Sequence, residues 1–394
     1  MSLRAFAAHL GVAVASVTNW ERRGHRIRLR DETQQILDRD LSRADEHVRQ
    51  RFEAALSAAT PATPTRLQTQ GTATPLANLG GFSPVEPTPV PRKVGRKEIA
   101  QVRLAADLFT SWDNAHGGGL AREAVFAQLS WCAKLLHVDS PEPVRRDLFA
   151  AVAELGGIAG FMAFDAYAHT DARRAFEFSL QCAEESRNWH VRASILSMRA
   201  RQAIWCGNPD DGLIYVEKAL VRSDQLTATE RASLHTLRAR ALAKMRRHHE
   251  TLTAVGVADE AFAHAKPADD PPWMAFYDHA QHHGDTGHAL WDLSVRGRRT
   301  EAAPRLAYSV AHHTPEYGRS RTMSRIKLAS LTMITGDPRK AAAVGHKALD
   351  DIADLRSRRA IDDVRELRRL AGRHRTMTEV ENLRDRITEV LDDQ

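Results

Sequence analysis

The chain has 394 residues, of which 43% are apolar, 27% are charged and 6% are aromatic. This composition is typical of a soluble helical protein with two or three domains. The sequence has no run of eighteen apolar residues and no signal-peptide pattern, so we expect neither a membrane span nor secretion. The three cysteines, Cys132, Cys182 and Cys206, are too few and too scattered for a disulfide framework or a zinc cage. We therefore expect a cytoplasmic protein without a metal or cofactor.

Positive charge is concentrated at the N-terminus. The formal net charge is +6 and the pI is about 9.4, which hints only mildly at an anionic partner. Residues 1–30, however, contain six arginines and a single acidic residue. The position of this charge is more informative than the total.

Residues 3–24, LRAFAAHLGVAVASVTNWERRG, predict two short helices joined at a glycine. Apolar side chains follow the three-and-four spacing of an amphipathic helix over residues 3–10. Gly11 can adopt a positive φ and end this first helix. The helical pattern resumes by Val14 and ends at Gly24. This arrangement is the helix-turn-helix plan.

Details of the segment support this plan. The second helix must cross close to the first, and Ala7 supplies the small residue that such a crossing needs. The tail NWERRG, residues 19–24, resembles the end of the recognition helix in phage-repressor-type (XRE-family) DNA-binding domains. The alternative is a pair of solvent-facing helices from some other bundle.

The resemblance implies that double-stranded DNA is the partner and that the second helix faces the major groove. Among the groove-facing residues, only Asn19 can bond adenine through both atoms of its amide. Val14 and Ala15 can touch a thymine methyl group. The expected base contacts are Ala13, Val14, Ala15, Ser16, Thr18 and Asn19.

Five arginines at and beyond the end of the second helix are better placed for DNA phosphates. Such contacts position a protein on the duplex without reading its sequence. The alternative for these side chains is a solvated basic loop. They are Arg22, Arg23, Arg26, Arg28 and Arg30.

Domains of this family normally carry one more helix before the motif, and Met1 leaves no room for it. Either the start is assigned too late, or the domain is trimmed, or another part of the chain covers the exposed face. Residues 32–41 and 44–56 have helical periodicity, so we expect a DNA-binding domain over residues 1–56.

Residues 57–97 are dominated by proline, threonine, alanine and glycine. Such a segment buries too little apolar surface to offset the entropy lost on ordering. We expect a flexible linker, extended at PTPVP. Alternatively, part of it packs on the following domain as a strap.

From residue 98 to residue 394 the sequence is a succession of helical patterns with short breaks, without clear strand alternation. The steps between successive breaks are 38, 38, 52, 39 and 38 residues, which predicts stacked helical hairpins. Residues 265–273 supply the insertion in the longest step. The turn residues are His169, Gly207, Met245, Gly297, Gly336 and His374.

Two units, starting at Cys206 and Thr335, resemble tetratricopeptide repeats. Pro209 and Pro338 fit the first turn of a helix, where a missing N–H costs nothing. Asn208 and Asp337 are suited to cap these helices. The resemblance predicts an all-α protein in which a tetratricopeptide-like array follows the small domain. The alternative is an irregular helical bundle.

A stack of hairpins curves and leaves a concave inner surface that suits peptides or partner helices. Polar or aromatic side chains on the first helix of each hairpin are candidates for this effector groove. Their alternative role is ordinary surface or core packing. The candidates are Arg201, Trp205, Arg240, Asp278 and Arg325.

The segment DHAQHHGDTGH, residues 278–288, concentrates histidines. His279 and His283 share a helical face, but the HExxH order of a zinc protease is absent. We expect these residues to line a helix end and a turn at residues 284–287. Residues 115–121, AHGGGLA, predict an interhelical turn because they lack the lysine of a phosphate loop.

The order of the parts resembles actinobacterial XRE-family regulators and the peptide-responsive quorum-sensing regulators of Gram-positive bacteria. The resemblance implies a homodimeric transcription regulator, not an enzyme, whose array binds a peptide or small-molecule effector. A two-fold dimer on an inverted repeat is the expected geometry. The competing hypothesis is a scaffold that binds protein partners and has lost DNA binding, and a third is a histidine-metal enzyme.

Overall fold

The computed structural model describes residues 2–23, 88–353, 355 and 357–392, together with the isolated residues 33, 34, 37, 40, 41, 45, 48 and 86. The chain divides into two units, Met1–Pro87 and Thr88–Gln394. In the described residues all regular structure is helical and no strand occurs, which confirms the all-α prediction. Most of the predicted helices 32–41 and 44–56, and of the linker 57–97, lies outside the described residues.

The first unit begins with two short helices, α1 (Leu3–Leu10) and α2 (Val14–Arg23). Ser2 caps α1, because its hydroxyl accepts a hydrogen bond from the amide of Ala5. Gly11 ends the helix with a φ of 69°, and the next amide, that of Val12, donates to the carbonyl of Ala7 at 3.0 Å. The predicted glycine turn is therefore present.

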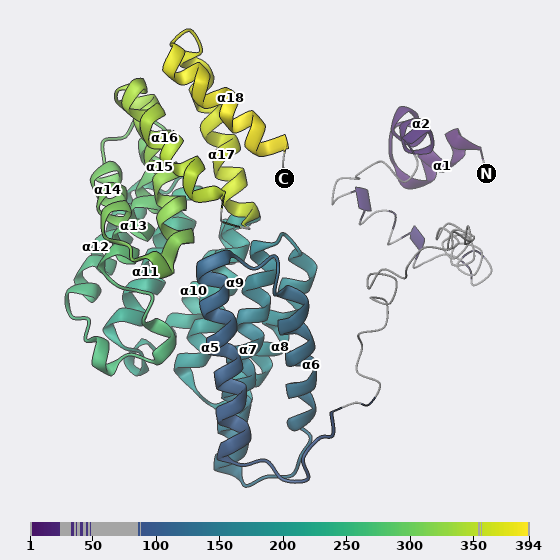
Figure 1. The fold of residues 1–394 in the computed structure, drawn as a ribbon. Helices are drawn as coiled ribbons and strands as arrows, with labels where there is room; N and C mark the ends of the chain where they lie inside the picture. Colours follow the sequence, from purple (N-terminus) through teal and green to yellow (C-terminus); the bar gives the residue numbers. More distant parts are fainter. Residues whose placement is uncertain are drawn as a thin grey trace, which may run out of the picture. The chain divides into compact units, whose positions relative to one another are not determined.

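The second unit contains fourteen α-helices within its described residues (Figure 1). Two of them precede a series of hairpins, and short 3₁₀ turns occupy several of the connections. The helices are α5 (Arg96–His116), α6 (Arg122–Leu135), α7 (Glu142–Asp165), α8 (His169–Ser186), α9 (Trp189–Trp205), α10 (Pro209–Leu220), α11 (Ala228–Lys244), α12 (His248–Ala263), α13 (His279–Ser294), α14 (Ala302–His312), α15 (Gly318–Thr335), α16 (Pro338–Ile352), α17 (Arg358–Ala371) and α18 (Thr378–Asp392).

From α7 onward, consecutive helices pair as antiparallel hairpins, so that α7 pairs with α8, α9 with α10, and so on to α17 with α18. Five of the six predicted turn residues fall in the connections inside these pairs, and the sixth, His169, is the first residue of α8. The predicted insertion lies between α12 and α13 and contains two short 3₁₀ turns, Pro267–Asp269 and Pro272–Met274. The spacing of the breaks therefore gave the hairpin boundaries correctly.

Four of the six connections inside the hairpins share one backbone geometry. Four of the turns contain a left-handed residue, namely Tyr167, Gly207, Arg246 and Gly297, with φ between 62° and 85°. At each of them the following amide donates to the carbonyl five residues earlier, at 2.9–3.2 Å, as in a Schellman motif. Glycine occupies only two of these four left-handed positions. The fold therefore imposes it on a tyrosine and an arginine as well.

The helices α10 and α16 begin as predicted. Pro209 and Pro338 are the first residues of these helices. Asp337 caps α16, with its carboxylate accepting from the amide of Arg339 at 2.9 Å. Asn208 occupies the cap position of α10, but its side chain makes no capping hydrogen bond.

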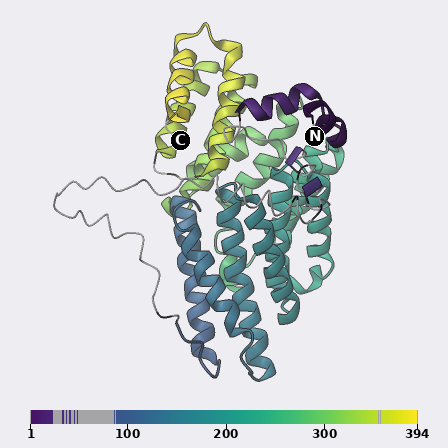
Figure 2. The same ribbon diagram turned by 90° about the vertical axis from the view of Figure 1, so that its right-hand side faces the viewer.

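The helix α5 packs along α7 and also reaches α15, far away in the sequence (Figures 1 and 2). Gly95 precedes α5, and its amide donates to the Glu98 carboxylate at 2.8 Å. Val94 is buried in the same apolar core as Ile99 and Val102 of this helix. The chain just before α5 therefore belongs to the second unit.

Two glycines expected at a turn lie inside a helix instead. Gly284 and Gly287 are interior residues of α13, so the predicted turn at residues 284–287 is wrong. A Cβ at Gly284 would lie 2.6 Å from Ser309 Oγ, and one at Gly287 would lie 3.0 Å from Leu306 Cγ. The glycines allow α14 to pack closely on α13, which outweighs their poor helix propensity. The turn predicted at residues 115–121 is present between α5 and α6.

One helix in the described residues, α7, is long and apolar enough to cross a membrane by length and composition. Its mean hydropathy over eighteen residues is 1.5, and 72% of that window is buried inside the protein. Helices α5, α6, α8 and α9 pack around it. It is therefore the central helix of the first part of the array.

We predict that Gly160→Ala destabilises the protein by about 1–2 kcal/mol, because overpacking outweighs the helix propensity of alanine. Gly160 lies on α7, and its Cβ would meet the buried Phe176 ring at 2.6 Å. The control is Gly256→Ala on α12, where a Cβ meets nothing within 4 Å. This change should stabilise by about 0.5–1 kcal/mol. Urea denaturation followed by circular dichroism measures both, and equal effects of the two changes contradict the packing account.

Candidate functional site

The candidate base contacts lie on the outer face of α2 and just before it. Ala13, Val14, Ala15 and Thr18 are exposed, and Ser16 and Asn19 are half-buried. On the opposite face Val17 is buried, as are Ala7 and Leu10 of α1. The helix thus presents a face of small and polar side chains while its apolar side packs inward.

Asn19 is held by a neighbouring arginine. Arg22 Nη2 donates to Asn19 Oδ1 at 3.1 Å, one helical turn away. Of the five predicted phosphate contacts, Arg22 is exposed, whereas the side chain of Arg23 and all of Arg26, Arg28 and Arg30 lie outside the described residues. In the same unit, His9 Nε2 of α1 lies 2.6 Å from Asp40 Oδ1.

The second unit contains a partly open cavity of about 440 Å³. Its walls come from α5, from α7, α9, α11, α13, α15 and α17, and from residues 272–276 of the insertion. All of these except α5 and the insertion are first helices of hairpins. The cavity is therefore lined mainly by the first helices of the hairpins, with α5 on one side. Its volume lies in the range that small-molecule sites occupy.

At one end of the cavity two arginines share one carboxylate. Arg201 Nη1 and Nη2 donate to the two oxygens of Asp285 at 3.2 and 3.0 Å, and Arg240 Nη1 lies 3.4 Å from Oδ1. Burial opposes ionisation of Asp285, but the two arginines hold its pKa well below the ordinary value. Burial and the nearby Arg201 lower the pKa of Arg240. This end of the cavity therefore carries a surplus of positive charge.

A second cluster joins four helices next to the cavity. Arg319 of α15 donates to Asp113 of α5 at 2.5 Å, and Arg359 of α17 donates through Nε to Asp165 of α7 at 2.6 Å. Arg319 also lies 3.9 Å from Asp165. Both guanidinium groups lie over the ring of Phe161, at 5.3 and 5.0 Å. Here the two cations are matched by two carboxylates.

The two carboxyl groups of this cluster differ. Burial opposes ionisation of Asp165, yet Arg359 and Arg319 lower its pKa, and the Ser357 hydroxyl donates to it at 2.9 Å. Burial raises the pKa of Asp113 in spite of Arg319, and its Oδ1 is buried without a hydrogen-bond partner among the described residues. Asp113 is thus the weakest member of the network.

Of the five residues predicted for the effector groove, the structure brings Arg201 and Arg240 together in the cavity. The other three lie elsewhere and have structural contacts. Trp205 donates from Nε1 to the Tyr167 hydroxyl at 2.9 Å, Asp278 caps α13 by accepting from the amide of Gln281, and Arg325 pairs with Asp351 of α16.

Sequence reasoning missed the carboxylates that face these arginines. Asp285 lies 84 residues from Arg201, and Asp113 lies 206 residues from Arg319. A single sequence gives no signal that pairs residues over such distances. The sequence also predicted a turn at Asp285, whereas this residue lies inside α13.

The histidine segment forms part of the core. His282 Nε2 lies 2.8 Å from Asp259 Oδ1, and Arg305 binds the same carboxylate from α14. The His282 ring stacks on Phe262. In the part of the chain that the structure describes, no group of three or more histidine, cysteine, aspartate or glutamate side chains could hold a metal ion.

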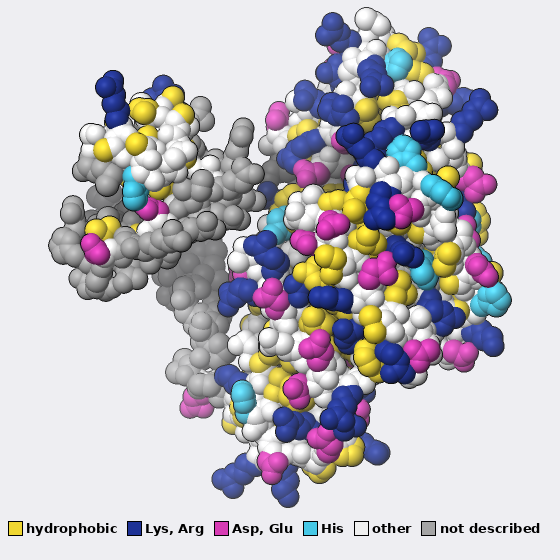
Figure 3. All heavy atoms as spheres, turned by 180° about the vertical axis from the view of Figure 1, so that it is seen from behind, with side chains coloured by type: hydrophobic (Ala, Val, Ile, Leu, Met, Phe, Trp, Pro, Cys, Tyr) yellow, Lys and Arg dark blue, Asp and Glu magenta, His cyan; other side chains and the backbone are white. Residues whose placement is uncertain are grey.

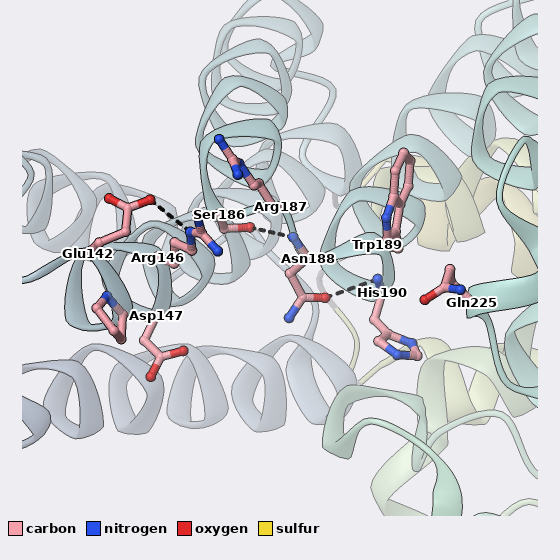
Figure 4. A pocket seen from close by; sticks show the side chains of 10 residues that line it. Glu142, Arg146, Asp147, Ser186, Arg187, Asn188, Trp189, His190 and Gln225 are labelled. Atoms are coloured by element: carbon pink, nitrogen blue, oxygen red, sulfur yellow. Dashed lines mark hydrogen bonds and ion pairs between the residues drawn. The ribbon is translucent and has the colours of Figure 1, made fainter.

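A second hollow, of about 610 Å³, lies at the surface beside the start of α7 and the α8–α9 turn (Figure 4). The polar side chains of this hollow bond to one another or cap helix ends. Glu142 pairs with Arg146 at 2.8 Å, the Ser186 hydroxyl accepts from the amide of Asn188, and Asn188 caps α9 at the amide of His190. The internal cavity is the stronger candidate because its arginines are not fully matched.

The surface seen from behind carries interspersed acidic and basic side chains (Figure 3). Basic side chains gather over the C-terminal hairpin, where four arginines line a small hollow. Two of these, Arg365 and Arg369, pair with acidic residues on α17 at 2.6 and 2.7 Å.

Comparison with known proteins gives no match: no family model, no curated protein and no solved structure resembles the chain. The two candidate sites therefore rest on the side chains described above.

We predict that Glu154→Gln removes a pH dependence of stability. Burial raises the pKa of this α7 carboxyl to about 7, with Arg103 favouring and Asp107 opposing its ionisation. The folded protein therefore keeps a proton that the unfolded chain releases near pH 4.5, so stability falls as pH rises from about 4.5 to 7. At pH 8 the variant should be more stable than the wild type by about 3 kcal/mol.

Urea denaturation at pH 5 and pH 8 measures this difference. Glu123→Gln, at an exposed position on α6, is the control for the loss of a glutamate. If both variants change stability alike at the two pH values, the assignment to Glu154 is wrong.

Proposed function

We propose that the chain is a DNA-binding transcription regulator of the phage-repressor type, with a tetratricopeptide-like array that dimerises and binds an effector. The observation that carries this proposal is the outer face of α2. It presents Asn19 and small side chains, follows a glycine turn after α1, and lies in an arginine-rich segment. A helix of this kind fits the major groove of DNA.

In this proposal Asn19 reads an adenine. Its Nδ2 donates to adenine N7 and its Oδ1 accepts from adenine N6. The Arg22 hydrogen bond leaves this possible, because a carbonyl oxygen has two lone pairs. Arg22 would therefore orient the side-chain amide of Asn19. Its other N–H groups would approach the phosphates of the DNA backbone. Exposed Val14 and Ala15 would contact thymine methyl groups.

In this proposal two copies of the chain dimerise through an exposed apolar face of α5. Leu104, Leu108 and Trp112 lie four residues apart on one face of this helix and are 68%, 63% and 42% exposed. An apolar stripe of this length rarely stays uncovered in a monomer. Because it is centred on Leu108, a two-fold axis there places Leu104 of one copy against Trp112 of the other. A second copy is the expected occupant, because repressor-type heads bind inverted repeats as two-fold dimers.

The test of the function is selection of bound duplexes from a random DNA library with the full chain. We expect an inverted repeat to be enriched, with affinity that falls as salt rises. A protein that enriches no sequence and ignores DNA at low salt would instead be the scaffold considered above.

We predict that Asn19→Ala relaxes specificity at one base pair of each half-site, with a loss of about 1–3 kcal/mol for the preferred base. Arg26→Ala, by comparison, should weaken binding to all sequences and reduce the salt dependence. Titration of the selected duplex and its single-base variants distinguishes the two. If Asn19→Ala weakens every duplex equally, this residue does not read a base.

We predict that Leu108→Glu converts a dimer into a monomer, because it places a charge at the centre of the apolar stripe. Sedimentation equilibrium of the full chain measures this change. Leu252→Glu, at a position on α12 that is 50% exposed, is the matched control and should leave the dimer intact. A dimer that survives Leu108→Glu assigns the interface to another surface.

A further inference from the structure

We infer that the internal cavity is a binding site for a small organic acid, with its carboxylate paired to Arg240 and its apolar part against the cavity wall. This inference deepens the function proposed above, since it names the chemical class of the effector. Binding itself takes place within the second unit and does not require DNA.

Around Asp285, two arginine side chains share a single carboxylate. Arg201 already takes both oxygens of this carboxylate, at 3.2 and 3.0 Å. In the described part of the chain, Arg240 makes a single hydrogen bond of 3.4 Å to the same group. The Arg240 side chain is 14% exposed and lines the cavity. A guanidinium group with five N–H donors is thus left facing the cavity with most of them unused.

The neighbouring groups do not balance this charge. Burial and the charges of Arg240 and Lys327 lower the pKa of His288 well below its ordinary value, so this cavity residue is neutral. Asp292 pairs with Lys244 at 2.9 Å. Glu230 lies ten residues before Arg240 on α11, about 15 Å away along the helix, and lies 2.7 Å from His190.

Two further carboxylates near the cavity are similarly engaged, while Asp107 of α5 also lines it. Asp113 and Asp165 are held by Arg319 and Arg359, as described above. Two buried guanidinium groups that share one carboxylate are only partly neutralised, which is unfavourable. An anion bound at Arg240 neutralises the surplus charge, which makes this end of the cavity selective for negative ligands.

The geometry favours a carboxylate over a phosphate. The surplus at this end is one charge, which one carboxylate neutralises, whereas a phosphate monoester carries close to two. The planar guanidinium fork also matches the two oxygens of a carboxylate. The cavity wall also contains apolar side chains, among them Ile158, Phe161, Met198, Met274 and Met323. Methionine side chains adapt readily to the shape of an apolar ligand.

The site also touches the helix that carries the proposed dimer surface. Thr110, Asp113 and Asn114 of α5 line the cavity, while Leu104 and Leu108 are exposed on the same helix. A ligand in the cavity and a second copy of the chain therefore contact one element. This gives the ligand a physical route to the arrangement of the dimer.

The test is isothermal titration calorimetry of the full chain with acetate, hexanoate, octanoate, 3-phenylpropanoate and indole-3-acetate. Each larger acid is compared with the alcohol and the amine of the same carbon skeleton. We expect at least one of the larger acids to bind at least tenfold more tightly than its alcohol and its amine. Inorganic phosphate at equal ionic strength should not displace it.

Three variants locate the site. Arg240→Met should weaken the best acid about 10- to 100-fold, as loss of a charged hydrogen-bonding partner does, and Arg240→Lys should retain part of the affinity. Arg238→Met, on the same helix but 41% exposed and paired with Glu217, should bind as the wild type does. Circular dichroism and thermal unfolding verify that each variant is folded.

The inference is overturned if no acid binds better than its alcohol, if Arg240→Met and Arg238→Met bind the acid equally, or if phosphate displaces it. These outcomes are independent of DNA binding. The selected duplex, titrated without any acid, tests the regulator proposal by itself.

Discussion

The second unit depends on a buried charge cluster that joins four helices distant in the sequence. Asp113 of α5 pairs with Arg319 of α15 across 206 residues, and Asp165 of α7 pairs with Arg359 of α17 across 194. Removing one member of such a cluster leaves a buried charge without a partner, which is strongly destabilising. The cluster therefore fixes where α5 lies. With α5 in place, this helix and the first helices of the hairpins together line the cavity.

In this arrangement the two faces of α5 have different surroundings. One face contributes polar side chains to the cavity, and the other exposes leucines four residues apart. A ligand can shift an equilibrium only by its difference in affinity between two states. An acid that bridges Arg240 and the apolar wall would favour the closed array over any state in which α5 has moved away. If the proposed function holds, that preference is where coupling between the acid and DNA binding would begin.

The sequence was sufficient to predict the hairpins and their boundaries, because local signals determine them. Gly207, Gly336, Pro209 and Pro338 mark helix ends through backbone geometry alone. The same rules misread Gly284 and Gly287, since a glycine that permits close helix packing looks identical to a turn glycine in a single sequence. At the left-handed positions Tyr167 and Arg246 the fold overrides local preference, so no residue type marked them.

The candidate site was predictable only in part. Arg201 and Arg240 were predicted as polar or aromatic side chains of first helices, but Trp205, Asp278 and Arg325 were predicted by the same criterion and have structural contacts. What distinguishes the first two is their shared carboxylate, Asp285, which arises from tertiary packing. The face of α2 was easier to predict, because a short motif carries its own turn, its crossing residue and its exposed side chains.

Native-state hydrogen exchange of the full chain, read peptide by peptide, tests most directly whether α5 closes the array. If the charge cluster fixes this helix, the amides of α5 should be protected to the same degree as those of α7, and they should exchange together in one cooperative opening. If the amides of α5 exchange orders of magnitude faster than those of α7, the charge cluster does not hold this helix in position. The cavity that α5 lines would then not be a stable feature of the protein.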